Sequence, residues 1–211
     1  MKRIHGLYAI TPDEQSTERL LESVRLAIEG GASVVQYRNK QADQVGRLWQ
    51  AQSLRSLTRA HDVRFIVNDS VELARTVEAD GVHLGGADGD IAAARALMPG
   101  KLIGASCYNN LQSALAAQAA GADYVAFGAA FPSPTKPQAV HARLNLFRQA
   151  KQSLRIPVVA IGGITVQNAS ALIEAGVDAL AVITALFAAE DIKAAAQAFA
   201  RLFQESRHAY P

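Results

Sequence analysis

The sequence has little of several things, and each scarcity excludes a class of protein. Cys107 is the only cysteine in 211 residues, which excludes an internal disulfide and a cysteine-rich metal site. Only 6% of the residues are aromatic, and the formal charge of +2 comes without a run of lysine or arginine, so a basic patch for nucleic acid or membrane is not indicated. No apolar run could span a bilayer, and the first residues, MKRIHGLYAIT, lack the apolar core of a signal peptide. We therefore expect a cytoplasmic protein.

Half of the residues are apolar, and they recur in one local pattern. An apolar-periodic segment ends, a glycine follows, and a short β-rich run comes next, in IEGGASVVQ (28–36), VEADGVHLG (77–85), QAAGADYVAFG (118–128) and IEAGVDALAV (173–182). The glycine is typical of a helix C-cap, and the unbroken apolar run is typical of a strand buried on both faces. This interpretation predicts eight strands, at 6–11, 33–38, 64–69, 81–84, 102–107, 124–128, 157–162 and 179–184. It predicts helices between them, for example at 17–29, 41–61, 110–120 and 166–175, and a last helix at 189–207.

Eight alternating strand and helix units in a chain of this length favour a (β/α)8 TIM barrel. A doubly wound open sheet is the alternative. No linker or shift in composition divides the chain, so we expect one domain covering residues 1–211.

Polar residues gather where the predicted strands end, which is where barrels of this kind place their active sites. We expect no comparable polar set at the opposite end of the barrel, and this asymmetry indicates an enzyme. The residues concerned are Gln36, Tyr37, Arg38, Asn39 and Lys40 after the second strand, Asn68 and Asp69 after the third, Asp88 after the fourth, Ser106 at the fifth, Ser133, Pro134, Thr135 and Lys136 after the sixth, Gly162 and Gly163 after the seventh, and Ile183 and Thr184 at the eighth.

The segment FGAAFPSPTKP (127–137) is unusual because three prolines fall within six positions. Proline forbids regular helix and removes backbone donors, so this loop is held nearly extended. Two hydroxyls and the ammonium of Lys136 lie between the prolines without a carboxylate nearby. A surface turn is one interpretation, and an anion site is the other.

The charged residues of the set suit a phosphate-rich ligand. Arg38, Lys40 and Lys136 are cations that bind phosphate oxygens. We interpret Asp69 and Asp88 as the only carboxylates at these strand ends, and each would repel a diphosphate unless a divalent ion lay between them. Mg²⁺ takes a few carboxylates together with substrate phosphate oxygens. Taken singly, Asp69 could instead cap the helix that follows it, and Asp88 could be a turn residue in GADGD.

The glycines of IGGIT predict a second place for a phosphate, since barrels often bind one in the loops after strands seven and eight. We interpret three other residues as structural. We expect His83 to be packed or hydrogen-bonded within its strand, Cys107 to be a small buried residue, and Trp49 to pack in the outer layer of its helix.

The segments QYRNK, VNDS, DGVHLG, IGASCYN, GADYVAFGAAFPSPTKP, VVAIGGIT and AVITALF occur in an order that resembles the thiamine-phosphate synthase family, from about Gly6 to Ala188. The resemblance implies an enzyme that joins hydroxymethylpyrimidine diphosphate to a thiazole phosphate with Mg²⁺, giving thiamine phosphate and diphosphate. It implies a dissociative mechanism without a protein nucleophile. Gln36–Lys40, Asn68, Ser106 and Lys136 would hold the pyrimidine diphosphate. Asp69 and Asp88 would hold Mg²⁺, and Ser133–Thr135, Gly163, Ile183 and Thr184 would hold the thiazole phosphate.

Among these residues, Lys136, Arg38 and Ser106 are those we expect to act in catalysis, by stabilising the departing diphosphate. The chain departs from the family pattern in Asn39, where an acidic residue is common, in Ser133 for threonine and in Gly86 for glutamine. Two other functions stay open. One is a thiazole tautomerase, which would need an acid or base and no metal pair; the other is a barrel that binds thiamine phosphate as a sensor. The partners expected are small molecules, and a homo-oligomer is left open.

Overall fold

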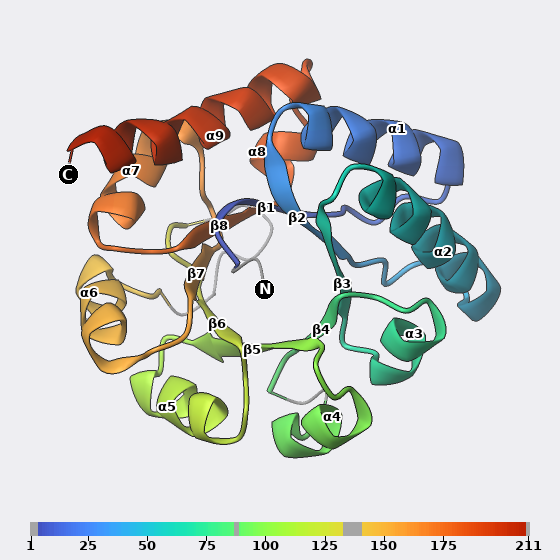
Figure 1. The fold of residues 1–211 in the computed structure, drawn as a ribbon. Helices are drawn as coiled ribbons and strands as arrows, with labels where there is room; N and C mark the ends of the chain where they lie inside the picture. Colours follow the sequence, from blue (N-terminus) through green and yellow to red (C-terminus); the bar gives the residue numbers. More distant parts are fainter. Residues whose placement is uncertain (1–3, 87–88, 133–140, 210–211) are drawn as a thin grey trace.

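The computed structural model describes residues 4–86, 89–132 and 141–209, with the side chains of 207–209 excepted. Eight parallel strands pair in chain order and close into a barrel, with β8 beside β1 (Figure 1). The strands are β1 (Gly6–Ile10), β2 (Ala32–Tyr37), β3 (Arg64–Asn68), β4 (Gly81–Leu84), β5 (Leu102–Tyr108), β6 (Tyr124–Phe127), β7 (Val158–Ile161) and β8 (Ala179–Val182). The predicted (β/α)8 barrel is confirmed, and the open sheet is excluded because β1 and β8 pair.

A ring of helices covers the outside of the barrel (Figure 1). They are α1 (Thr17–Glu29), α2 (Gln44–Ala60), α3 (Val71–Thr76), α4 (Ile91–Leu97), α5 (Leu111–Ala119), α6 (Leu144–Ser153), α7 (Val166–Glu174), α8 (Thr184–Phe187) and α9 (Ile192–Ala209). The last helix, α9, packs tightly against the end of α1, since a Cβ on Gly30 would collide with the Cβ of Ala196. Within the part of the chain that the structure describes, no helix is long and apolar enough to cross a membrane.

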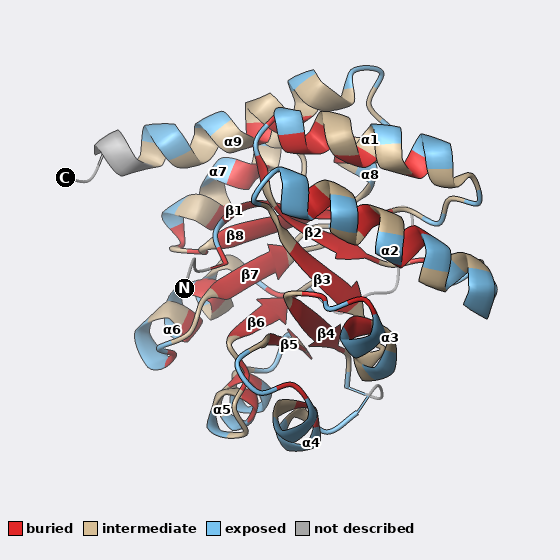
Figure 2. Cartoon of the chain, turned by 45° about the vertical axis from the view of Figure 1, so that its right-hand side comes forward, coloured by how far each residue is buried: buried red, intermediate tan, exposed pale blue. Residues whose placement is uncertain are grey.

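Alternate residues of each strand serve two different layers, as the pleat requires. Tyr8, Val34 and Ile66 belong to the cluster inside the barrel. Their neighbours in the chain, such as Val35 and Val67, pack outward against the helices. Figure 2 shows the strands buried and the helices exposed on their outer sides.

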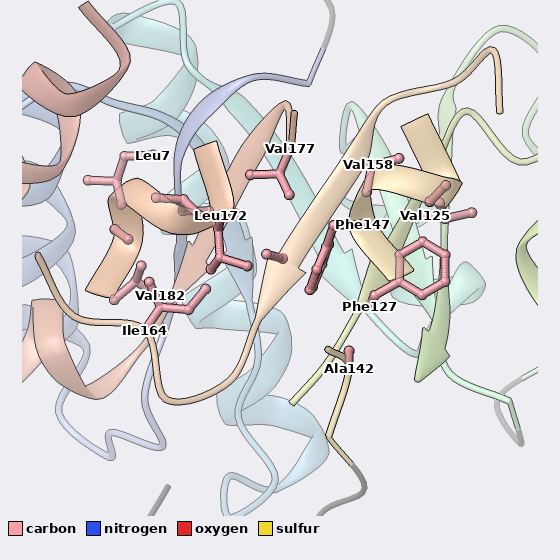
Figure 3. Close-up of a cluster of buried hydrophobic side chains, with 14 of the residues drawn as sticks. Leu7, Val125, Phe127, Ala142, Phe147, Val158, Ile164, Leu172, Val177 and Val182 are labelled. Atoms are coloured by element: carbon pink, nitrogen blue, oxygen red, sulfur yellow. The ribbon is translucent and has the colours of Figure 1, made fainter. Parts of the chain in front are cut away.

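The outward layer includes a large apolar cluster on one half of the barrel (Figure 3). Phe127 of β6 meets Phe147 of α6 there, with ring centroids 6.1 Å apart and ring planes at 83°. Such an edge-to-face pair is worth about 0.5–1.5 kcal/mol beyond its burial. This contact helps to fix the end of β6, where the proline-rich loop begins.

The predicted glycine C-caps are confirmed in three of the four repeats. Gly31, Gly121 and Gly176 follow their helices with φ of 107°, 100° and 92°, values that favour a residue without a Cβ. The repeat at 77–85 is different. Glu78 takes the left-handed position there, with φ of 52°, and Gly81 lies within β4.

The end of the barrel where the strands begin carries a polar set of its own, so the expected asymmetry is wrong. An aspartate stands directly before β4, β6 and β8, and its carboxylate accepts the N–H of a residue in the preceding strand. These pairs are Asp80 with Phe65 at 2.9 Å, Asp123 with Ile103 at 2.7 Å and Asp178 with Val158 at 2.7 Å. Each aspartate also pairs with a cation from the helix that leads into that preceding strand, namely Arg55 of α2, Arg95 of α4 and Lys151 of α6. These groups tie strand to strand and helix to sheet, so polar residues at this end serve the fold.

The positions of two residues, Trp49 and Thr184, differ from those predicted. Trp49 is 62% exposed, and the predicted packing of its side chain is wrong. The buried face of α2 is formed by Gln50, Ala51, Leu54 and Thr58, so Trp49 lies beyond its edge. At the end of β8, Thr184 begins the short helix α8 and is not a strand residue.

Candidate active site

The carboxyl end of β2 presents its predicted residues on two sides. Gln36 is 3% exposed and lies inside the barrel, where its amide contacts Asn68 of β3 at 2.5 Å. Tyr37 points the other way, and its hydroxyl donates to Gln50 of α2 at 2.8 Å. Burial raises the pKa of Tyr37 above its ordinary value, which keeps this phenol protonated. Because successive side chains of a strand point to opposite faces, Gln36 and Tyr37 lie on opposite sides of β2.

Asn39 is 5% exposed, and its side chain organises the loop that follows β2. Its amide group donates to the carbonyl oxygen of Glu14 at 2.8 Å and to Gln50 at 3.0 Å. Its oxygen accepts the N–H groups of Gln41 and Ala42, both at 3.0 Å. Both the amide group and the oxygen of Asn39 are therefore hydrogen-bonded to neighbouring segments. An acidic residue at this position could not donate the hydrogen bonds to Glu14 and Gln50.

A cavity of about 350 Å³ opens at the carboxyl ends of β2 and β3. Arg38, Lys40 and Arg47 line it together with two carboxylates, Asp69 and Glu72. Its other lining residues are Tyr37, Asn39, Asn68, Ser70, Val71 and Leu73. The structure therefore brings together most of the residues predicted after the second and third strands.

Asp69 is held in a backbone conformation that few residues adopt, with φ of 64°. Left-handed backbone in a residue other than glycine is uncommon and carries strain, although aspartate tolerates it better than most. Asp69 does not cap α3, because Ser70 is the N-cap and accepts the N–H of Leu73 at 3.1 Å. The alternative role of Asp69 as a cap is wrong. Its carboxylate lies 3.9 Å from the ammonium of Lys40.

Asp13 is a further carboxylate at these strand ends, and the sequence patterns did not single it out. It follows β1, lies 3.3 Å from the guanidinium of Arg38, and accepts the N–H of Lys40 at 2.7 Å. The view that Asp69 and Asp88 were the only such carboxylates is therefore wrong. The segment TPDE directly follows the first strand, so the expectation that polar residues after the strands form the site applies to Asp13 as well.

A connected set of side chains fills the inside of the barrel near these strand ends. Besides the contact of Gln36 with Asn68, Tyr8 donates to Gln36 at 2.6 Å and lies 2.8 Å from the hydroxyl of Tyr124. The set continues from Tyr124 to His83 at 3.1 Å, and from His83 to Ser106 at 2.9 Å. The predicted packed and hydrogen-bonded His83 is confirmed. The two tyrosines were missed, although each is a polar-tipped aromatic within an apolar strand.

The ends of β7 and β8 are neighbours, because Ile161 pairs with Ala181. Gly163 has φ of 64°, and a Cβ there would lie 2.5 Å from the carbonyl oxygens of Phe131 and Pro132. The glycine therefore allows the segment after β6 to pack closely. Ile183 follows β8 and accepts the N–H groups of Leu186 and Phe187, while Thr184 is exposed at the start of α8.

Five predicted site residues lie outside the described residues: Asp88, Ser133, Pro134, Thr135 and Lys136. Among residues 4–86, 89–132 and 141–209, no three or more His, Cys, Asp or Glu side chains group in a way that could hold a metal ion. Mg²⁺ needs no such group, since it binds through one or two carboxylates, substrate phosphates and water. The carboxylate of Asp69, which lines the cavity, is of the kind that Mg²⁺ binds.

The closed barrel and the charged cavity at the carboxyl ends of its strands define an enzyme of the (β/α)8 class. The chain also matches the family model described as thiamine monophosphate synthase over residues 7–186. The chain therefore belongs to the thiamine monophosphate synthase family. The prediction of this enzyme class from the motifs is confirmed.

The relatives agree with this assignment over nearly the whole chain. The chain is 55% identical over 201 residues to the thiamine-phosphate synthase of Methylobacillus flagellatus, covering 95% of this chain and 96% of that one. It is 55% identical over 202 residues to that of Chromobacterium violaceum, covering 95% and 97%. Among solved structures, a thiamine phosphate pyrophosphorylase from Pyrococcus furiosus is 41% identical with a TM-score of 0.85, covering 95% of this chain and 96% of that chain.

Proposed function

We propose that this enzyme joins hydroxymethylpyrimidine diphosphate to a thiazole phosphate and releases thiamine phosphate and diphosphate. Membership of the family and the names of its relatives support the product. The observation within the chain that carries the proposal is the cavity at β2 and β3, where Arg38 and Lys40 lie beside Asp69. A diphosphate needs such cations, and a carboxylate among them suits a metal that the diphosphate also binds.

The charges around the cavity support a role for Mg²⁺. Three cations and two carboxylates line it, and Asp13 adds a third carboxylate through its contacts with Arg38 and Lys40. These charges nearly cancel, so the described residues alone offer little net attraction to a diphosphate. Mg²⁺ bound by Asp69 and Asp88 would supply positive charge that offsets the charge of the leaving diphosphate. Lys136 would add to it from the loop after β6.

The chain's own residues would act on the diphosphate as binding and charge-stabilising groups. In a dissociative reaction the bond from the pyrimidine methylene to the diphosphate breaks first, and the thiazole nitrogen then attacks the resulting cation. Arg38, Lys40 and Lys136 would hold the departing group, whose charge grows as the bond lengthens, and Ser106 would help to hold the pyrimidine diphosphate in place. Asn68 and Gln36 would fix the pyrimidine diphosphate in position, and alignment of the two substrates supplies the rest.

The thiazole phosphate would bind at the neighbouring strand ends. Ser133, Pro134, Thr135, Gly163, Ile183 and Thr184 are the residues proposed for it. Within the described residues, the N–H of Gly163 has no hydrogen-bond partner, and it lies in the turn between β7 and α7 where a backbone donor can meet an oxygen. The loop after β6 would then link this phosphate to the diphosphate held by Lys136.

One assay tests the proposal. The protein is given both substrates and Mg²⁺, diphosphate release is followed by a coupled reaction, and thiamine phosphate is identified by mass spectrometry. Reactions that omit either substrate or contain excess chelator serve as controls. The proposal predicts diphosphate only in the complete mixture. Failure to release diphosphate there, with both substrates shown to be intact, would contradict it. Binding of thiamine phosphate without turnover would indicate a sensor, and isomerisation of the thiazole phosphate alone would indicate a tautomerase.

A further inference from the structure

One side chain from each of six strands joins the hydrogen-bonded set inside the barrel. In the order of contact they are Asn68 of β3, Gln36 of β2, Tyr8 of β1, Tyr124 of β6, His83 of β4 and Ser106 of β5. We refer to these residues as the six-strand chain. Its two ends, Asn68 and Ser106, are residues predicted to bind the substrate. The middle members, Tyr8 and Tyr124, are 1% and 0% exposed, so no ligand reaches them.

The protons of the two phenols give the chain a direction. Tyr8 has one proton, and it donates it to the carbonyl oxygen of Gln36, which is only an acceptor. Tyr124 must therefore be the donor in the contact between the two hydroxyls. Having used its proton, Tyr124 must accept from Nδ1 of His83. Burial raises the pKa of both tyrosines well above the ordinary value, so neither phenol is lost as a donor.

The direction continues to both ends of the chain. A neutral His83 with its proton on Nδ1 has a lone pair on Nε2, so the hydroxyl of Ser106 donates to it at 2.9 Å. At the other end, the amide of Gln36 donates to the oxygen of Asn68 at 2.5 Å. The amide group of Asn68 then remains as a pair of N–H donors, whereas Ser106 offers lone pairs. The two ends of one chain therefore present opposite hydrogen-bonding character.

The packing around the chain preserves this arrangement. Gly104 of β5 lies against it, and a Cβ at that position would lie 2.6 Å from Nδ1 of His83 and would collide with the phenol of Tyr124. The rings of Tyr8 and Tyr124 also contact each other, with centroids 6.0 Å apart. Buried polar groups that are all satisfied fix one arrangement, because any reversal leaves a donor or an acceptor unpaired.

We propose that Tyr8 and Tyr124 are positioning residues that hold the six-strand chain in one direction, so that Asn68 faces the substrate as a donor and Ser106 as an acceptor. The tyrosines act through Gln36 and His83 and touch no substrate. The inference rests on the proposed function only for the identity of the substrate; the direction of the chain follows from the contacts alone.

The direction can be measured without any substrate. Nitrogen NMR of labelled protein in alkaline buffer shows which ring nitrogen of His83 carries the proton. The expected result for the unaltered protein is a proton on Nδ1. In Tyr8→Phe, Tyr124 loses its acceptor and can turn its proton toward Nδ1 of His83. The imidazole proton should then move to Nε2, although Tyr8 does not contact His83. A proton on Nε2 in the unaltered protein, or no change in Tyr8→Phe, overturns the proposal.

Kinetics test the link to the substrate. Tyr8→Phe keeps the ring and should lower kcat/KM for diphosphate release by about 10- to 100-fold, the usual effect of losing a group that orients a binding residue. In a background with both Asn68→Ala and Ser106→Ala the same change should have less than about a 2-fold effect, because Tyr8 acts on the substrate only through these two ends of the chain. Thr58→Val is the matched control, since it removes a buried hydroxyl of α2 outside the barrel. It should lower stability without changing kcat/KM.

The outcomes separate the two proposals. If the unaltered protein releases diphosphate but Tyr8→Phe behaves like Thr58→Val, the positioning role is wrong and the function stands. Equal effects of Tyr8→Phe in the two backgrounds would also overturn the positioning role. If the unaltered protein releases no diphosphate, the proposed function fails, and the NMR result alone decides the direction of the chain.

Discussion

The ammonium of Lys40 lies 3.9 Å from the carboxylate of Asp69, across the carboxyl ends of β2 and β3. The two residues follow neighbouring strands whose paired residues are 30 positions apart in the sequence, with Gln36 opposite Ile66 and Tyr37 opposite Val67. Barrel closure therefore brings a cation and a carboxylate from separate motifs to one cavity. Lys40 is 63% exposed, so the pair contributes little to stability, and its significance is its position.

Asp69→Asn tests the metal assignment. Asparagine tolerates left-handed backbone and cannot replace a carboxylate as a Mg²⁺ ligand, so we expect a stable protein that needs far more Mg²⁺ for turnover. The measurement is diphosphate release as a function of Mg²⁺ concentration. Ser16→Ala is the control: it removes the cap of α1 outside the cavity and should lower the free energy of unfolding by about 1 kcal/mol without changing the Mg²⁺ requirement. Full activity of Asp69→Asn at ordinary Mg²⁺ would contradict the assignment.

Lys136→Ala tests the proposed charge on the departing diphosphate. Removing a preorganised donor to a group that gains charge in the transition state costs about 2–4 kcal/mol, so turnover should fall by orders of magnitude. Thermal unfolding should stay close to that of the unaltered protein. A fall in activity that merely follows a fall in the unfolding temperature would show that the lysine serves the fold.

Substituting one of the aspartates that precede the strands should lower the stability of the fold without lowering catalytic activity. Asp178 accepts the N–H of Val158 at 2.7 Å and pairs with Lys151 at 2.7 Å, at the end of the barrel opposite the cavity. In Asp178→Asn the amide oxygen can still accept the N–H, but the charge-assisted contact is lost. We expect the free energy of unfolding to fall by about 1–3 kcal/mol, as measured in urea, with kcat/KM unchanged below the unfolding transition. Unchanged stability would show that the ion pair contributes nothing.

We expect the burial of Cys107 to make the stability of the protein fall as the pH rises into the alkaline range. Burial raises the pKa of this thiol from 9.0 to about 12, and the residue is 1% exposed. A raised folded pKa means that the contribution to stability is complete below the unfolded pKa of about 9 and is lost as the pH rises toward 12. Each pH unit in that range should remove about 1.4 kcal/mol. Urea unfolding between pH 8 and pH 11 should therefore show a steeper alkaline decline in the unaltered protein than in Cys107→Ala; equal slopes would contradict the shift.

Local signals predicted the fold well because each acts over a few residues. The helix at 17–29 was predicted with both of its ends, since Ser16 caps its start and Gly30 its end. The site was predicted at the level of strand ends for the same reason. Contacts between strands were not predicted: the outward turn of Tyr37, the pairing of Asp13 with Arg38 and the contact of Tyr8 with Tyr124 depend on register and on closure of the barrel. Local patterns specify which side a residue faces only when the first residue of the strand is known.

Gly163→Ala tests whether the turn after β7 positions the loop after β6. The new Cβ would lie 2.5 Å from the carbonyl oxygens of Phe131 and Pro132, which lead directly into Ser133 and Lys136. The sequence alone suggested that a side chain here would affect only the thiazole phosphate. The close packing instead predicts a rise in KM for the thiazole phosphate together with a fall in kcat, because the displaced segment carries residues proposed for both anions.

Gly100→Ala is the matched control for this change. Gly100 also has a left-handed φ, 74°, but nothing lies within 4 Å of its missing Cβ. Its substitution should cost about 1–2 kcal/mol of stability from backbone strain alone and leave both kinetic constants unchanged. Gly163→Ala should lose more stability than Gly100→Ala, because it adds a collision to the same strain. If the two variants lose equal stability and Gly163→Ala keeps normal kinetics, the close approach of these segments does not position the loop.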